Sequence, residues 1–469
     1  MTPPPTSGAN SAAARDIANV LHPYTDLEAH LQAGPVVIAR GKGVRVWDDT
    51  GKEYIESASG LWCASLGFDN ERLVQAAMNQ MRKLPFYHAF TAKSHEPMID
   101  LAEMLIARAP VPMSKVFFAN SGSEANDSAI KMVWYLNNAL GRPTKKKIIG
   151  RVKGYHGITI GSASLTGLPA NHRSFDVPLP GFLHTATPHF YHGALPGETE
   201  EAYATRCADE LEKLILAEGP DTVAAMWAEP IMGAGGVILP PAGYFPKIQA
   251  VLRKYDVLLV ADEVICGFWR TGNYWGSQTL SIQPDILVCA KALSASYLPI
   301  SAVMVNAKVF QALAQESHAI GTFGHGFTYS GHPVSAAVAV ETLKIYDEMD
   351  IGSHVRDVGA YMQAELLRRF ADHELVGEVR GTGLIAAVEL VADKAAHGNF
   401  DPAAKVGPRL SKLCEEHGVI TRVVSNDTLC FSPPLVISRA EIDEMLVRIE
   451  KALGELTVQV RREQIAVVK

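Results

Sequence analysis

The sequence predicts an α/β protein built on a mostly parallel β-sheet, and three observations support this fold class. Between about residues 67 and 343, short apolar runs such as "KKIIGR", "VAAMWAEP", "VLLVADEV" and "DILVCAK" alternate with segments of helical period such as "ERLVQAAMNQMRKL". Strands that are apolar along their whole length are typical of a parallel sheet covered on both faces. Before this region, short β-like runs separated by Gly and Asp-Asp-Thr-Gly turns predict a small antiparallel element. After it, "GEVRGTGLIAAVELV", "TLCFSPPLVIS" and a long helical pattern predict an α+β cap.

We therefore divide the chain into four parts. Residues 1–26 are expected to form a flexible tail, because "MTPPPTSGANSAAAR" is rich in Pro, Ser and Ala and has no apolar core. Residues 27–65 form the N-terminal part of a small domain and residues 66–343 a large domain. Residues 344–469 complete the small domain.

Composition excludes several kinds of partner. The formal net charge of −7 argues against nucleic acid or an anionic membrane surface, which require a basic face. The sequence contains no run of 18 or more apolar residues, so no membrane-spanning helix is expected. The 6 cysteines are scattered without a CxxC pair, which is typical of reduced thiols in the cytoplasm. The 16 histidines show no HExxH or similar spacing, so no metal is expected.

Polar residues follow five of the predicted strands, where ligands bind in open α/β sheets. After "VFFA", the turn from Asn120 to Ser123 precedes a helix, and its free backbone N–H groups suit a phosphate. A serine N-cap with Glu124 in the first turn explains the same residues equally well. After the next strand, Tyr155 could stack on a planar ligand or fill a core. Glu229 ends a third run and is either functional or the anchor of a turn.

The last two strand ends carry opposite charges. Asp262 ends "VLLVAD", and a buried carboxylate there needs a cation or a strong donor. Lys291 ends "DILVCA" with no acidic residue nearby, and a buried lysine has a lowered pKa and can form a Schiff base. A structural ion pair and a lysine reaching solvent are the alternatives. Together, the five positions indicate a site for pyridoxal 5'-phosphate, in which Asp262 keeps the ring nitrogen protonated.

The chain resembles class III pyridoxal-phosphate aminotransferases of fold type I. The motifs "NSGSEAND", "GYHG", "AEPIMGAGGV", "DEVICGFWRTG", "AKALS" and "GFTYSGHP" carry this resemblance, which runs from about Leu21 to the final helix. It implies a large domain with a mostly parallel seven-stranded sheet and a small α+β domain built from both termini.

The resemblance implies a role for each motif residue. Lys291 would form the Schiff base with the cofactor, and Asp262 would pair with the pyridine nitrogen. Tyr155 would stack on one face of the ring and Val264 on the other. The remaining cofactor-binding residues would be Ser121, Gly122, Ser123, His156, Glu229 and Thr328.

Thr328 would reach the phosphate of a neighbouring subunit, so the resemblance implies a homodimer or a larger oligomer such as a tetramer. Two further stretches, "GLWCASLGF" and "PFYHAF", resemble the (S)-selective ω-transaminase, or amine:pyruvate, subgroup. Its large and small substrate pockets would be formed by Leu61, Trp62, Phe90, Tyr155, Ile158 and Ile231. Arg422 would bind the carboxylate of pyruvate and swing away for an apolar amine.

Some positions depart from the family pattern. Ala292, Ser296 and Ser301 stand where relatives have glycine, and Thr91 stands where a second aromatic residue is common. If those glycines need positive φ, the loop is reshaped or strained here.

The expected reaction is a ping-pong transfer of an amino group from an amine or ω-amino acid to pyruvate, giving L-alanine and an aldehyde or ketone. β-Alanine, taurine, a polyamine and an aryl-alkyl amine are all open as donors. Another PLP enzyme on the same fold, such as an aminomutase, racemase or decarboxylase, is the nearest alternative. A dinucleotide enzyme fits poorly, because a strand-like run and not a helix follows "GTGLIA". A third alternative is a binding protein that uses no cofactor, but in that case Lys291 would have to be chemically inert.

Overall fold

A 7-stranded sheet, with strand order β4-β10-β9-β8-β7-β5-β6, forms the centre of the protein. The computed structural model describes residues 10–425 and 427–465. The strands are β4 (Lys115–Ala119), β5 (Lys147–Arg151), β6 (Phe182–Thr185), β7 (Val223–Ala228), β8 (Leu258–Asp262), β9 (Ile286–Cys289) and β10 (Ser301–Val305). β10 pairs antiparallel with both of its neighbours, and the other pairs are parallel. The predicted α/β fold with a mostly parallel sheet is confirmed.

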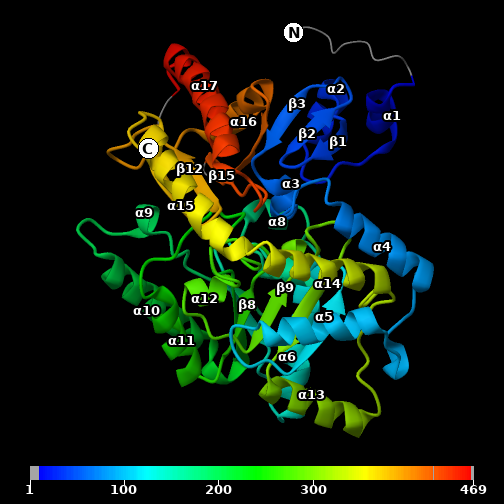
Figure 1. Ribbon diagram of the computed structural model, residues 1–469. Helices are drawn as coiled ribbons and strands as arrows, with labels where there is room; N and C mark the ends of the chain where they lie inside the picture. Colours follow the sequence, from blue (N-terminus) through cyan, green and yellow to red (C-terminus); the bar gives the residue numbers. More distant parts are fainter. Residues whose placement is uncertain (1–9, 426, 466–469) are drawn as a thin grey trace.

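Helices cover both faces of this sheet (Figure 1). On one face Trp227 packs with α6 (Gly122–Ala139) and α13 (Ala307–Ile320). On the other face Met226 packs with α10 (Glu200–Glu218) and α11 (Tyr244–Lys254). Successive residues of β7 thus enter different cores, which is why the strand is apolar throughout.

Two smaller sheets complete the fold. The first has the order β1-β2-β3-β13 and the second the order β11-β12-β15-β14. Their strands are β1 (Ile38–Lys42), β2 (Arg45–Asp48), β3 (Glu53–Glu56), β11 (Val376–Thr382), β12 (Ile385–Leu390), β13 (Val419–Ile420), β14 (Arg422–Val424) and β15 (Thr428–Phe431). Because β13 pairs in parallel with β3, segments from the two ends of the chain share one sheet. The domain boundaries themselves stay a prediction.

The other helices connect and cover these sheets. They are α3 (Ser59–Trp62), α4 (Glu71–Lys83), α5 (Glu96–Ala107), α7 (Ile160–Leu165), α8 (Pro169–His172), α9 (Phe190–Gly193), α12 (Gly276–Thr279), α14 (Pro333–Glu348), α15 (Ile351–Phe370), α16 (Val406–Glu416) and α17 (Arg439–Glu463). Short 3₁₀ helices are η1 (Phe90–Ala92), η2 (Pro220–Thr222), η3 (Lys291–Ser294) and η4 (Pro402–Ala404). Within the described ranges, no helix combines the length and apolarity that a membrane crossing demands.

The N-terminal segment differs from the expected flexible tail. Residues 1–9 lie outside the described residues, but α1 (Ala12–Asn19) follows directly and α2 (Leu27–Ala33) comes next. Ser11 caps α1 by accepting a hydrogen bond from the backbone N–H of Ala14. The alanines of "AAARDIAN" favour a helix once this cap is in place.

Candidate active site

The carboxyl ends of three adjacent strands bring Glu229, Asp262 and Lys291 together. β7, β8 and β9 lie side by side in parallel, so their ends meet at one edge of the sheet. Glu229 and Asp262 are 3% and 4% exposed, whereas Lys291 is half-buried. The arrangement places two carboxylates and one amine at the edge where open α/β sheets bind ligands.

Asp262 is held in place from three directions. Its Oδ2 accepts hydrogen bonds from His156 Nδ1 at 2.8 Å and from Asn126 Nδ2 at 2.9 Å. Among the described residues, its Oδ1 accepts a single, longer bond of 3.2 Å, from the backbone N–H of Val264. Oδ1 can therefore accept a further hydrogen bond, from the N–H of a protonated ring nitrogen.

Glu229 fixes the backbone around Tyr155. Its Oε1 accepts a hydrogen bond from the backbone N–H of Tyr155, and its Oε2 accepts one from that of Gly233, both at 2.9 Å. Burial raises the pKa of Glu229. Burial also raises the pKa of Tyr155, and the nearby hydroxyl of Tyr24 raises it further. The phenol of Tyr155 therefore stays protonated.

Burial lowers the pKa of Lys291, and the charges of Asp262 and Glu229 oppose this shift only in part. Lys291 begins η3 with a φ of 53°, a left-handed backbone that is uncommon for a residue other than glycine. Such strain is concentrated at functional positions. A lysine with a lowered pKa carries a neutral, nucleophilic amine more readily than an exposed one.

The N-terminus of α6 forms the next wall of the site. Ser121 caps the helix by accepting a bond of 3.2 Å from the N–H of Glu124, as the N-cap interpretation predicts. The backbone N–H groups of Gly122 and Ser123 donate no hydrogen bond to any residue that the structure describes. The cap and a phosphate are therefore compatible, because two donors at a helix N-terminus are left for an anion.

The loop that carries Tyr155 docks against this helix terminus. The N–H of Ile158 donates to Ser123 Oγ at 3.1 Å, and Gly157 has a φ of 132°. A Cβ at Gly157 would lie 2.5 Å from Ser123 Oγ, so only glycine fits. A Cβ at Gly122 would lie 3.2 Å from Val264, which places Val264 beside the helix terminus.

The residues expected to contact substrate fall into two groups. Trp62 and Ile231 are buried and share one apolar cluster. Leu61, Phe90 and Ile158 are 59%, 47% and 61% exposed. The two groups therefore do not close one buried pocket within a single chain.

Phe90 and Thr328 belong to one exposed surface. The ring of Phe90 lies 3.2 Å from the position of a Cβ at Gly326, two residues before Thr328. The rings of Phe86 and Tyr329 meet edge-on at 5.7 Å. Thr328 is exposed as well, so this surface carries three aromatic side chains around a polar residue.

Arg422, at the start of β14, lies near enough to Lys291 and Tyr155 to act on the pKa of both. None of the ion pairs among the described residues involves Arg422. A guanidinium without a carboxylate partner is suited to bind a substrate carboxylate in two hydrogen bonds.

The three departures from family glycines have different outcomes. Ser301 opens β10, is buried, and donates from Oγ to the carbonyl of Ser121 at 2.8 Å, so its hydroxyl links β10 to the cap of α6. Ala292 is buried without positive φ. Ser296 has a φ of 62° and follows Ala295 at 48°, so this part of the loop is strained.

Two residues of the site escaped the sequence analysis. Asn126 lies one turn into α6 and links Asp262 to Trp227, whose Nε1 donates to Asn126 Oδ1 at 2.9 Å. Helical spacing from Gly122 places it on the face toward the sheet, so its position could have been found. Tyr24 contacts Asn171 and approaches Tyr155 from a segment that shows no such pattern.

Comparison with known proteins shows the family of this chain. The model of the aminotransferase class-III family matches residues 28–453. A gamma aminobutyrate transaminase of Solanum lycopersicum (isoform 3, chloroplastic) is 50% identical over 456 residues, which cover 96% of this chain and 87% of that protein. Vanillin aminotransferase of Capsicum frutescens is 49% identical over 448 residues, covering 94% and 97%.

A solved structure agrees with these relatives. The ω-transaminase of Pseudomonas jessenii in complex with PMP superposes with a TM-score of 0.94 at 56% identity, over 96% of this chain and 99% of that one. Class III aminotransferases use pyridoxal phosphate, and the free N–H groups of α6, the open Oδ1 of Asp262 and the amine of Lys291 fit its phosphate, ring nitrogen and aldehyde. The chain belongs to the class III aminotransferases and is a PLP-dependent enzyme.

Proposed function

We propose that the protein transfers an amino group from an amine or an ω-amino acid to pyruvate. The observation that carries this proposal is the guanidinium of Arg422, which has no ion-pair partner among the described residues and lies close to Lys291 and Tyr155. Such a site must accept a keto acid, which has a carboxylate, and also an amine that has none. It therefore needs a cation that binds the carboxylate of the keto acid and stays unused when the amine is bound. The solved relative from Pseudomonas jessenii is an ω-transaminase, which supports the same reaction class.

The cofactor, when bound, supplies an aldehyde that exchanges amino groups and a ring that withdraws electrons. Lys291 is the residue that holds this aldehyde and, once displaced, moves the proton at the substrate carbon as base and then acid. Asp262 keeps the proton on the ring nitrogen, and His156 and Asn126 keep Asp262 oriented. Tyr155 and Val264 are the proposed faces of the ring site.

The phosphate is proposed to lie on the N–H groups of Gly122 and Ser123, beside Ser121. Thr328 would contribute from the partner subunit of a homodimer, or of a tetramer built from such dimers. The exposed surface of Phe86, Phe90 and Tyr329 supports this assembly, because aromatic side chains are enriched at protein interfaces.

The substrate pockets are proposed to form where the buried Trp62 and Ile231 meet the exposed Leu61 and Ile158, with Phe90 supplied by the partner. We also propose a cytoplasmic location, which is supported by six free cysteines. Tagged protein in cell fractions tests the location, and a light-scattering mass tests the dimer.

The test of the reaction is a half-reaction experiment. The holoenzyme is mixed first with an amine donor and then with pyruvate, while visible absorption of the cofactor is followed. We expect the amine to bleach the yellow absorption and pyruvate to restore it with one equivalent of L-alanine. Failure of pyruvate, when 2-oxoglutarate or glyoxylate restores the colour, would contradict the proposed acceptor.

γ-Aminobutyrate is a second candidate donor, favoured by the names of the plant relatives. Its carboxylate would use the same Arg422, whereas an aryl-alkyl amine would use the aromatic pocket. The name of the Capsicum relative likewise points to vanillylamine and vanillin as an aromatic pair. Comparing kcat/KM for γ-aminobutyrate, β-alanine, 1-phenylethylamine and vanillylamine decides between these donor classes.

A further inference from the structure

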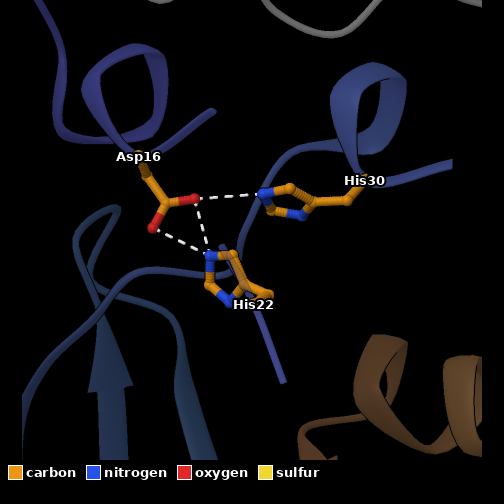
Figure 2. Close-up of side chains that lie close together, drawn as sticks. All are labelled: Asp16, His22 and His30. Carbon is orange, nitrogen blue, oxygen red and sulfur yellow. Dashed lines mark hydrogen bonds and ion pairs between the residues drawn. The ribbon is translucent and has the colours of Figure 1, made fainter. Parts of the chain in front are cut away.

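Three potential metal ligands meet in the N-terminal segment, outside the active site. Asp16 on α1, His22 in the connecting loop and His30 on α2 turn their side chains toward one another (Figure 2). His22 Nε2 lies 2.8 Å and 3.0 Å from the two carboxylate oxygens of Asp16. His30 Nε2 lies 3.1 Å from Asp16 Oδ1.

The three side chains are partly exposed to solvent, and two of them are positioned by helices. His22, Asp16 and His30 are 29%, 20% and 9% exposed, so water can reach a fourth position beside them. The two imidazole rings lie 4.4 Å apart and are tilted by 48°, so both Nε2 atoms face the carboxylate from different directions. Capped helices hold two of the ligands, since Ser11 caps α1 and Asp26 caps α2.

These donors have the chemistry of a zinc site. Two imidazole nitrogens, one carboxylate and a water are a common set of four ligands for Zn²⁺. Ligand atoms at Zn²⁺ distances of about 2.1 Å lie about 3.4 Å apart in a tetrahedron, so the present nitrogen–oxygen spacings need to open by only about half an ångström. Neither ring Nδ1 has a partner among the described residues, and each can carry the ring proton when Nε2 binds a metal.

We propose that Asp16, His22 and His30 bind one Zn²⁺ ion per chain. The ion fastens α1 to α2 and closes the loop between them. This loop contains Tyr24, whose hydroxyl contacts Asn171 and approaches Tyr155 at the active site. The effect of the ion on the enzyme is to hold the segment from residue 11 to residue 34 over the site.

The absence of short ligand spacings led the sequence analysis to expect no metal. Here Asp16 and His22 are separated by five residues and His22 and His30 by seven, and the ligands meet only because the loop folds back. A second cluster among the described residues, His189, His192 and Glu389, already contains the cation Arg380 beside Glu389, which disfavours a metal ion.

The test measures zinc directly on the holoenzyme. Protein freed of metal with a chelator is titrated with ZnCl₂ by calorimetry, and bound zinc is counted by mass spectrometry after gel filtration. We expect one Zn²⁺ per chain. Asp16→Asn, His22→Ala and His30→Ala are each expected to weaken binding at least about 100-fold, and His318→Ala, at an exposed position on α13, is expected to bind like the wild type.

Limited proteolysis supplies a second readout that does not depend on activity. Zinc is expected to slow cleavage between residues 11 and 34 in the wild type and in His318→Ala, but not in His30→Ala. No zinc binding by the wild type at micromolar concentration overturns the proposal. Equal binding by the wild type and all three ligand variants also overturns it, and leaves these residues as a hydrogen-bonded cluster alone.

Discussion

The two ends of the active site differ in how their polar groups are satisfied. At the cofactor end, Asp262 and Glu229 are buried and each carboxylate accepts hydrogen bonds at both oxygens. At the substrate end, Arg422 has no ion-pair partner among the described residues, and Leu61 and Ile158 are exposed. Fixed groups suit chemistry that is the same in every turnover, whereas unpaired and exposed groups suit a changing substrate. Substitutions at the cofactor end should therefore reduce all reactions alike, and those at the substrate end should change the choice of substrate.

The largest expected effect is at Lys291. Lys291→Ala removes the amine that we propose holds the cofactor and carries the proton, so turnover should fall by about 10⁴-fold for every donor and acceptor. Steady-state rates with several substrate pairs measure this. Lys412→Ala, at an exposed position on α16, serves as the control and should keep full activity. Near-normal turnover by the Lys291 variant would refute the assignment.

Arg422 should separate the substrates. Arg422→Ala removes charge-assisted hydrogen bonds, so the KM for pyruvate should rise about 10- to 100-fold, while kcat/KM for an apolar amine in the first half-reaction stays within about twofold. Arg82→Ala, at an exposed position on α4, is the matched control. An equal loss for both half-reactions would remove the distinction between the two ends of the site.

Asn126 tests whether the fixed end depends on its supports. Asn126→Ala leaves Asp262 with one hydrogen bond fewer and Trp227 Nε1 without its acceptor, so kcat should fall about 10-fold for all substrates. Asn137→Ala, also buried on α6 but with a side chain that donates to the carbonyl of Val133 in its own helix, should lower stability without changing kcat per folded molecule. If both variants lower kcat equally, the effect comes from helix packing and not from Asp262.

The smallest expected effect is at Ser296. The φ of 62° at Ser296 destabilises the folded protein by about 1 kcal/mol or more. Glycine would remove this strain, but part of the gain is lost because glycine makes the unfolded chain more flexible. Ser296→Gly should therefore raise the melting temperature by about 1 °C. Calorimetric scans at a fixed rate measure this, with Ser317→Gly, near the C-terminal end of α13, expected to lower it. A lower melting temperature for Ser296→Gly would show that the serine is not strained.

The strand ends were the most predictable part of the molecule. Apolar runs that stop at one polar residue located Glu229, Asp262 and Lys291, because a parallel sheet brings such ends to one edge. Contacts between distant segments could not be read in this way. The bond from Ser301 to Ser121 joins residues 180 positions apart, and the meeting of Asp16 with His30 depends on how a loop folds back. Neither contact leaves a local periodicity in the sequence.

The pairing of β3 with β13 also has a consequence for how the chain is made. Residue 55 pairs with residue 419, so the edge of β3 has no partner until 364 more residues have been synthesised. At typical ribosomal rates this takes roughly 20–70 s, during which an open strand edge is available for misplaced pairing. Removing residues 419–469, and with them β13, would leave that edge without its partner strand and open to misplaced pairing with another chain.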